Sequence, residues 1–468
     1  MKNDYFLKHL SAIFPYQPTS EQRSAMLLLS DFLTASENNR LLLINGYAGT
    51  GKTTLLGVLV KMMDALQQKT ILMAPTGRAA KVFSEYALHP AFTIHKKIYR
   101  QKSFSGDFSG FSLTDNQHKD TLFIVDEASM IANENTGVAV FGSGCLLDDL
   151  IKYVYSGDNC RLVLTGDTAQ LPPVSLTFSP ALNDDYLLRY HLLLTTVHLT
   201  QVVRQEEDSG ILFNATSIRE SLRNGVIDIY PRILTENYTD IQKISGAELI
   251  EELASAYSRD GLEDTMIICR SNKTANIYNN GVRNRILYRE EELSKGDRLM
   301  VVKNNYYWST AHPHHDFIAN GEIVSVLRVR GEEEVHGLRF CNVQVRFEDD
   351  DTEIEMKILP DVLHNESPAA SKEMSDQLFL SVSESYSEIK NRSERMKMIK
   401  ADPYFNAVQV KYAYAVTCHK AQGGQWSNVF LDVGYVTAEM MGENFYRWLY
   451  TAFTRATKRL YLVNWQLS

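Results

Sequence analysis

Residues 41–60, LLLINGYAGTGKTTLLGVLV, decide the fold. An apolar run at 41–45 leads into a segment with the pattern G-x-x-x-x-G-K-[S/T], and a helical apolar pattern follows. The glycines allow backbone N–H groups to converge on phosphate oxygens at a helix N-terminus, Lys52 supplies a positive charge, and the Thr53 hydroxyl can ligate Mg²⁺. The segment therefore predicts a strand, a phosphate-binding loop and a helix, with nucleotide contacts from Gly46, Gly49, Gly51, Lys52, Thr53 and Thr54.

Another apolar run, at 122–125, ends in two adjacent carboxylates, Asp126 and Glu127. Hydrolysis of a nucleoside triphosphate needs acids at a strand end near the phosphate loop, one for Mg²⁺ and one to activate water. We assign the metal to Asp126 and the role of general base to Glu127. A further run, at 161–165, is followed by Gln170, which we interpret as a detector of the terminal phosphate; ordinary turn chemistry after Gly166 is the alternative.

Apolar runs recur in both halves of the chain with enough sequence between them for crossover helices, a pattern typical of parallel sheets with helices on both faces. The first half has runs at 41–45, 70–74, 122–125 and 161–165, and the second half at 265–269, 408–417, 429–433 and 460–464. Alternating apolar and polar residues over 321–358 predict a small β-barrel inserted in the second half. Residues 101–119 are polar and glycine-rich and predict a protruding hairpin or loop. Residues 360–400 are charged and predict a solvated helical face, with a phosphate-contacting patch as the alternative.

Composition narrows the class of protein. The 468 residues suggest roughly three domains. A formal charge of -9 excludes a uniformly basic coat for nucleic acid but leaves room for a local basic groove. The five cysteines are scattered and match neither a disulfide framework nor a zinc site, which favours a reducing compartment. No run of about 18 apolar residues predicts a membrane span, and the first residues do not match a signal peptide, so we expect a cytoplasmic protein.

The order of the motifs resembles that of superfamily 1 helicases, specifically the RecD-like and Dda-like 5′-to-3′ branch called superfamily 1B. Further stretches that match motifs of this family lie before and after the phosphate loop and the acids at 126–127. They are 19–22 (TSEQ), 74–80 (APTGRAA), 93–96 (TIHK), 199–205 (LTQVVRQ), 417–423 (TCHKAQG) and 450–456 (YTAFTRA). Two stretches depart from the family's pattern, Cys418 and residues 424–426. The resemblance covers nearly the whole chain.

The resemblance implies an α/β fold with two tandem RecA-like parallel-sheet motor domains, a hairpin inserted in the first and an SH3-like β-barrel inserted in the second. The implied division is 1–96 and 121–180 for the first motor domain, 97–120 for the hairpin, 181–297 and 406–468 for the second motor domain, and 298–405 for the barrel. It also implies that Gln22 reads adenine and that Arg204 and Arg455 contact the terminal phosphate. Because Lys52 and Glu127 lie in one half and both arginines in the other, the ATP site must lie between two domains.

The resemblance also implies a path for one nucleic-acid strand. Strand contacts are expected from Thr76, Arg78, Lys81, Thr93, His95, Thr417 and His419, and a wedge at the duplex junction from Phe104, Phe108 or Phe111. Alternatives remain at this point, because a threonine can cap a helix, a histidine can belong to the core, and loop aromatics often pack beneath their loop.

The expected protein is an ATP- and Mg²⁺-dependent DNA helicase moving 5′ to 3′ on single-stranded DNA and opening forked duplexes, in the setting of DNA repair or recombination. We expect a monomer, with a single-strand-binding protein or a nuclease as a partner. A translocase that displaces proteins without separating strands is the first alternative. A phosphotransferase acting on a small substrate is the second, and the two arginine-bearing motifs argue against it.

Overall fold

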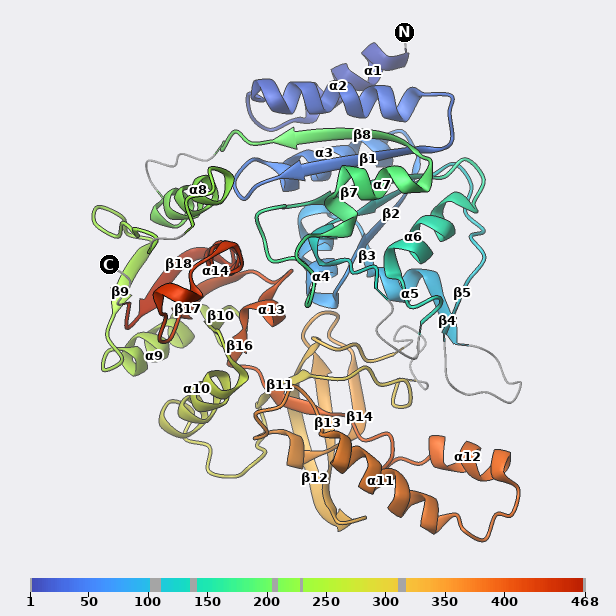
Figure 1. Ribbon diagram of the computed structural model, residues 1–468, viewed down its shortest axis with the longest axis vertical. Helices are drawn as coiled ribbons and strands as arrows, with labels where there is room; N and C mark the ends of the chain where they lie inside the picture. The colour runs from blue at the N-terminus through green and yellow to red at the C-terminus, as the bar shows by residue number, and fades with distance from the viewer. Residues whose placement is uncertain are drawn as a thin grey trace.

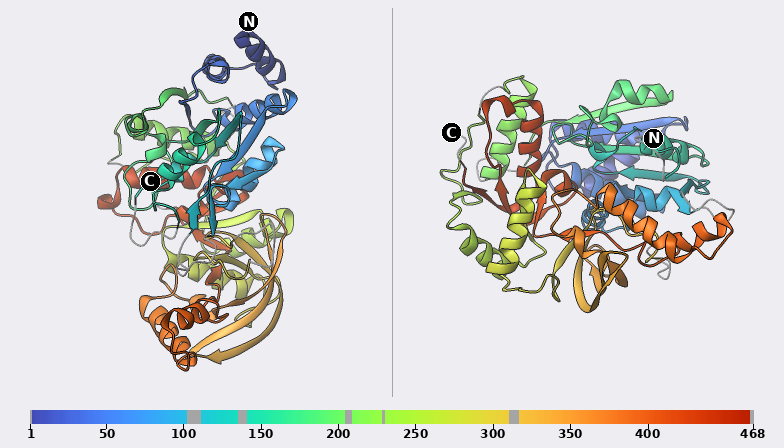
Figure 2. Two further views of the ribbon diagram at one scale, coloured as in Figure 1. Left: turned by 90° about the vertical axis from the view of Figure 1, so that its right-hand side faces the viewer. Right: turned by 60° about the horizontal axis from the view of Figure 1, so that its bottom comes forward.

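The computed structural model describes residues 2–101, 111–134, 141–203, 209–227, 230–309 and 317–465. Within them lie two parallel sheets, each covered by helices, and one five-stranded antiparallel sheet (Figure 1). The antiparallel sheet and its helices project from the two parallel-sheet domains at the end of the molecule far from the N-terminus (Figure 2). None of the described helices is long and apolar enough to cross a membrane.

The first sheet has the strand order β3-β2-β6-β7-β1-β8, and all its pairs are parallel. Its strands are β1 (Arg40–Gly46), β2 (Lys69–Ala74), β3 (Ala91–Thr93), β6 (Thr121–Val125), β7 (Arg161–Gly166) and β8 (Leu193–Leu199). Alternate residues of β1 serve opposite faces: Leu42 and Ile44 pack with one group of helices, and Leu41 and Leu43 with another. The first group is α1 (Lys2–Ile13), α2 (Ser20–Thr34), α3 (Lys52–Ala65) and α4 (Gly77–Ala87); the second includes α5 (Ile94–Ile98) and α6 (Leu146–Tyr155). The predicted parallel sheet with helices on both faces is confirmed.

The expected boundary after residue 180 is wrong, because β8 belongs to the first sheet. This strand pairs with β1 over its whole length, from Arg40 with Leu193 to Gly46 with Leu199. It lies at the edge of the sheet and pairs with one neighbour, and only two of its seven residues are buried. An edge strand needs no continuous apolar run, and the sequence LLTTVHL therefore does not stand out as a strand.

The second sheet has the order β16-β10-β17-β18-β9 and is also parallel throughout. Its strands are β9 (Ile241–Ile244), β10 (Thr265–Cys269), β16 (Ala415–Thr417), β17 (Trp426–Asp432) and β18 (Ala456–Val463). One face carries α8 (Gly210–Arg223), α13 (Cys418–Ala421) and α14 (Glu443–Phe453), and the other carries α9 (Leu249–Asp260) and α10 (Asn272–Arg285). All five cysteines of the chain are free thiols, as expected.

The antiparallel sheet has the order β14-β13-β12-β11-β15. Its strands are β11 (Arg298–Val301), β12 (Ile323–Val335), β13 (Leu338–Phe347), β14 (Glu353–Ile358) and β15 (Val410–Tyr412). A bridge between Ile358 and Val408 brings its two edges together. The helices α11 (Lys372–Ser385) and α12 (Arg392–Lys400) pack against one end of this unit. An inserted β unit is therefore present, and its SH3-like character stays a prediction.

The sequence predicts one strand over the run at 408–417. The structure has two strands there, and they lie in different sheets. β15 belongs to the antiparallel sheet and β16 to the second parallel sheet. The Asn279 side chain holds the corner between them: its oxygen accepts from the N–H groups of Tyr414 and Ala415, and its nitrogen donates to the carbonyls of Tyr412 and Ala415. Because this bend depends on a side chain more than a hundred residues away in sequence, local periodicity could not predict it.

Candidate functional site

The phosphate loop leaves the end of β1 and enters α3. Gly49 and Gly51 have φ values of 78° and 85°, a region that other residues rarely adopt. A Cβ atom on Gly51 would also lie 2.5 Å from Nε2 of Gln22. The Lys52 ammonium group folds back over the loop and donates to the carbonyls of Gly46 and Tyr47. The loop thus has the predicted conformation, with its lysine directed at its own backbone.

Gln22 lies under the phosphate loop. Its side chain is 1% exposed, its oxygen accepts from the N–H of Thr19 at 3.0 Å, and its nitrogen donates to the carbonyl of Thr50 at 3.0 Å. Both ends of the amide are therefore engaged with backbone groups, one of them in the loop itself. Recognition of adenine by Gln22 stays a prediction.

The two predicted acids follow β6. One oxygen of Asp126 accepts from the Tyr86 hydroxyl at 2.6 Å and the other from the N–H of Glu127 at 2.8 Å, so its orientation is fixed. Burial raises the pKa of Glu127; the charge of Arg455 opposes the rise, the Asp126 carboxylate adds to it, and Lys52 again opposes it. These groups come from three separate parts of the sequence, and the fold brings them close enough to act on one carboxyl group.

Arg455 reaches this cluster from the second domain, in the connection between α14 and β18. It is 2% exposed. Its guanidinium donates to the carbonyls of Thr451 and Gly424, each at 3.1 Å, and to the hydroxyl of Thr454 at 3.1 Å. No carboxylate neutralises it among the ion pairs of the described residues, so its charge is held by backbone dipoles in the interface between the domains.

Arg204, the other predicted arginine, lies outside the described residues. The described chain leading to it lies against the phosphate loop: the N–H of Val203 donates to the carbonyl of Gly49 at 2.9 Å. Its contact with a phosphate stays a prediction.

The loop after β7 forms the other side of the cluster. One oxygen of Asp167 accepts from the N–H of Ala169 at 2.9 Å. The side-chain oxygen of Gln170 is buried and has no hydrogen-bond partner among the described residues. A buried acceptor without a partner costs free energy, and a ligand that donates a hydrogen bond to it would remove that cost. The role of Gln170 as a detector of the terminal phosphate stays a prediction.

Helix α14 holds this loop from the second domain through residues that sequence reasoning missed. Arg447 donates to the carbonyls of Thr168 and Gln170, and the Thr451 hydroxyl accepts from the N–H of Leu171 at 2.8 Å. Tyr450, between them, contacts both the phosphate loop and Asp167. The spacing 447, 450, 451 places these side chains on one helix face, a signal that could have identified them.

Several predicted strand-binding residues have structural partners. The hydroxyls of Thr76 and Thr93 accept from backbone N–H groups at 3.2 and 3.1 Å and cap α4 and α5, the alternative considered for both. His95 is half-buried, its ring centroid lies 4.8 Å from that of Phe141, and burial lowers its pKa to about 4. Neutral His95 can therefore contribute shape and hydrogen bonds to a strand but no charge.

Arg78 and Lys81, on α4, lie in the interface with the second half of the chain. Arg78 donates to the carbonyl of Gln425 at 3.2 Å, and Lys81 donates to the carbonyl of Glu348 in the turn that follows β13. The Glu348 carboxylate pairs with Arg298 at 2.7 and 2.8 Å, and both side chains are buried. The two basic residues thus share their surroundings with an acidic turn that is fastened to β11 of the antiparallel sheet.

Thr417 and His419 lie at the second sheet, where β16 meets α13. Thr417 is half-buried and His419 exposed. A small cavity beside Thr417 is also lined by Lys411 and Lys420, two lysines whose pKa values burial lowers. Neither lysine was predicted, and both add positive charge near the expected strand contacts.

Of the three wedge candidates only Phe111 is described. It begins β5 (Phe111–Leu113), which pairs with β4 (Tyr99–Gln101) in an antiparallel ribbon. Phe111 is 7% exposed, and its ring centroid lies 4.6 Å from that of Tyr306 in the second half of the chain. It packs beneath the ribbon, as the alternative held. Phe104 and Phe108 lie outside the described residues.

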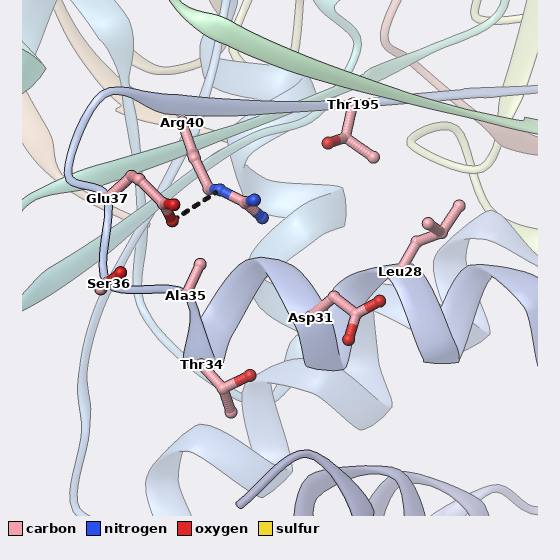
Figure 3. A pocket seen from close by; sticks show the side chains of 8 residues that line it. All are labelled: Leu28, Asp31, Thr34, Ala35, Ser36, Glu37, Arg40 and Thr195. Atoms are coloured by element: carbon pink, nitrogen blue, oxygen red, sulfur yellow. Dashed lines mark ion pairs between the residues drawn. The ribbon is translucent and has the colours of Figure 1, made fainter.

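An open cavity of about 600 Å³ has none of these motif residues in its lining. Figure 3 shows the side chains that line it. It is beside the start of β1, at Arg40, whereas the phosphate loop follows the end of the same strand. Arg40 pairs there with Glu37 at 3.4 Å. Sequence reasoning predicted no site at this edge.

Comparison with known proteins agrees with this geometry. The AAA domain family matches residues 19–231, and the UvrD-like helicase C-terminal domain family matches residues 412–463. An uncharacterized protein of Acanthamoeba polyphaga mimivirus is 24% identical, over 94% of this chain and 98% of its own. The ATP-dependent RecD2 DNA helicase of Deinococcus radiodurans is 23% identical over 92% of this chain, which spans 48% of that relative. A solved structure of two coordinating Pif1 helicases at forked double-stranded DNA superposes with a TM-score of 0.50 at 17% identity, covering 97% of this chain and 93% of the other.

The fold and the phosphate loop define the class of P-loop NTPases, and the loop lies against helix α14 of a second parallel-sheet domain. Within that class, the two family matches and the RecD2 relative make the chain similar to the RecD-like helicases, the resemblance that the sequence motifs implied.

Proposed function

We propose that the protein couples Mg-ATP hydrolysis to 5′-to-3′ movement along single-stranded DNA and to separation of duplex strands. The observation that carries the proposal is the position of Arg455: a buried arginine from the second domain whose charge acts on Glu127 in the first. Because the site contains charged groups from both domains, the change in charge on ATP hydrolysis alters how the two domains are held against each other. Arginines in this role typically contribute about 10³ to 10⁵ in rate.

The residues of the loop and of β6 suit Mg-ATP. The Thr53 hydroxyl and the Asp126 carboxylate are the oxygen ligands that Mg²⁺ prefers, and Lys52 supplies a charge for phosphate oxygens. When bound, the metal ion neutralises charge on the terminal phosphates. Glu127 is the general base in this proposal. Its raised pKa favours proton acceptance, and the neighbouring positive charges keep the deprotonated form accessible.

Movement along the strand would use two sets of contacts, one on each domain. Arg78, Lys81 and His95 belong to the first domain, and Thr417 and His419 to the second. Closure of the interface would shorten the distance between the sets once per ATP. Because Arg78 and Lys81 contact the second half of the chain, a strand entering here has to exchange those contacts for its own phosphates.

Forked DNA as the substrate, and the polarity, rest on resemblance. The superposed Pif1 structure is described as acting at forked double-stranded DNA. A single-strand-binding protein or a nuclease is the proposed kind of partner, and the proposed state is a monomer. Phe104 and Phe108 are the proposed wedge residues, since Phe111 is buried.

The test is an assay of ATP hydrolysis and unwinding with purified protein. We expect hydrolysis at low salt to rise strongly with single-stranded DNA, and a duplex with a 5′ tail to be opened in preference to one with a 3′ tail. Absence of stimulation would contradict the motor, and preference for the 3′ tail would contradict the polarity. Matched RNA substrates would identify the nucleic acid.

A translocase that displaces proteins without separating strands is the second candidate. The burial of Phe111 favours it, because this aromatic residue of the β4–β5 ribbon is unavailable for stacking on a base pair. Such a protein would keep the DNA-stimulated hydrolysis and fail to open a forked duplex.

A further inference from the structure

One side chain of the second domain contacts both the phosphate loop and the neighbouring strand end of the first. Tyr450, in α14, is 1% exposed. Its hydroxyl donates to a carboxylate oxygen of Asp167 at 2.7 Å and accepts from the backbone N–H of Ala48 at 2.9 Å. A single oxygen atom of one domain is thus bonded to two functional loops of the other.

The direction of these bonds is defined by charge. Burial, and then the nearby Asp167 carboxylate, raise the pKa of Tyr450 well above its ordinary value, so the hydroxyl keeps its proton. That proton points to Asp167, which leaves the oxygen lone pairs to accept from Ala48. The arrangement is a relay from a backbone N–H through a neutral hydroxyl to a carboxylate.

Ala48 is the third residue of the phosphate loop, GYAGTGKT. In loops of this type the backbone N–H groups are the donors that phosphate oxygens use. A single N–H makes one strong hydrogen bond. The Tyr450 hydroxyl therefore competes with a phosphate oxygen for the same donor.

The contacts around Tyr450 would transmit the loss of its hydrogen bond with Ala48 to the rest of the second domain. Its helical neighbours Arg447 and Thr451 hold the backbone of residues 168–171, and Gln422 donates to the carbonyl of Leu171 at 2.7 Å. Release of the hydroxyl from Ala48 would loosen one bond of a connected set that joins α14 to the strand end.

We propose that Tyr450 is a positioning residue that occupies the Ala48 N–H when the phosphate loop is free and gives it up when nucleotide phosphates bind, so that α14 responds to the state of the loop. This rests on the proposed function in taking ATP as the nucleotide and in the DNA-stimulated hydrolysis that serves as one readout. It adds a coupling element that works through the loop and does not touch the reacting atoms.

The substitution Tyr450→Phe tests this, because it removes the hydroxyl and keeps the buried ring. Without its competitor, the loop should bind Mg-ATPγS about three- to tenfold more tightly, a change typical of one hydrogen bond. Binding would be measured by titration calorimetry without DNA. Stimulation of hydrolysis by single-stranded DNA should fall, because α14 no longer follows the loop.

The control is Tyr278→Phe, which removes another Tyr–Asp bond, between Tyr278 and Asp432, that stays within the second domain. It should leave nucleotide affinity unchanged. Hydrogen exchange over residues 44–52 gives a second readout. Without nucleotide, these residues should exchange faster in Tyr450→Phe than in the wild-type protein. With Mg-ATPγS bound, the variant and the wild-type protein should exchange at the same rate.

A purely structural role for Tyr450 would weaken nucleotide binding and speed exchange in both states. That result, or unchanged affinity with unchanged exchange, would overturn the proposal. Failure of the wild-type protein to bind Mg-ATPγS would instead contradict the proposed function, so the two outcomes are distinguishable.

Discussion

The two parallel sheets have the same architecture, yet they supply different things to the site. In the first domain, functional groups follow the ends of strands: the phosphate loop follows β1, Asp126 follows β6 and Asp167 follows β7. In the second domain, the groups that reach the nucleotide side come from α14 and the connection after it, through Tyr450 and Arg455. In the proposed function, the first domain therefore binds the nucleotide and carries the reaction, and the second domain responds through one face of α14.

The difference also appears in how the charged groups are held. Lys52 bends over its own loop, while Arg455 is fastened by two carbonyls and a hydroxyl of its own domain. A fastened arginine moves with its domain as one body. The comparison teaches that similar folds can hold their charged groups differently, a lysine by its own loop in one domain and an arginine by the backbone of the other, and three substitutions test the roles proposed for the two domains.

The largest effect is expected for Lys52→Ala. Hydrolysis should fall to background, because the loop loses its only lysine, while the circular dichroism spectrum should stay that of the wild type. Lys61→Ala, on the exposed face of the same helix, is the control and should retain full hydrolysis. Normal turnover in Lys52→Ala would show that the first domain does not hold the reaction.

Arg455→Lys should have the next largest effect. The charge remains, but the planar group that bonds Thr451, Gly424 and Thr454 is lost, and DNA-stimulated hydrolysis should fall by about 10³. Calorimetric binding of Mg-ATPγS should change far less. Arg283→Lys, at another buried arginine of the second domain, should lower stability and spare hydrolysis; equal losses in both variants would mean that Arg455 is only structural.

The smallest effect concerns the contact between α4 and the acidic turn. Burial, and then Glu322, raise the pKa of Asp349 to about 7, against the opposing charges of Arg78 and Lys81, with Glu348 also raising it. Because the folded-state pKa lies above the unfolded value, protonation of this carboxyl stabilises the fold in acid, and that contribution is lost as pH rises through about 7.

Asp349→Asn should therefore raise the melting temperature at pH 8.5, by about 2 to 6 °C, and the gain should shrink towards pH 4. Thermal unfolding monitored by circular dichroism would measure it. Asp351→Asn, at an exposed carboxylate of the same turn, should show no such dependence. A constant difference at all pH values would contradict the assigned titration.

Much of the site could be predicted because its signals are local. The phosphate loop and the acids at 126–127 each combine an apolar strand with a short polar motif, and both strands are buried as expected. Sequence patterns did not predict the β8 edge strand, because it lacks a continuous apolar pattern. They also did not predict the division of the run at 408–417, because the bend there depends on Asn279. The structural roles of Thr76, Thr93 and Phe111 were foreseen only as alternatives, because the same side chain serves a cap, a core or a ligand equally well.

By itself, the amino-acid sequence determined the chemistry available: a loop that can bind phosphates, adjacent acids, and arginines in motifs far along the chain. Only the tertiary structure decided which of these groups meet, because the hydroxyl of Tyr450 and the charge of Arg455 act across an interface between residues some 280 to 400 positions apart. Short-range patterns reflect backbone conformation and burial, whereas contacts across domains depend on how whole sheets and helices pack. That packing is what joins the second domain to the phosphate loop.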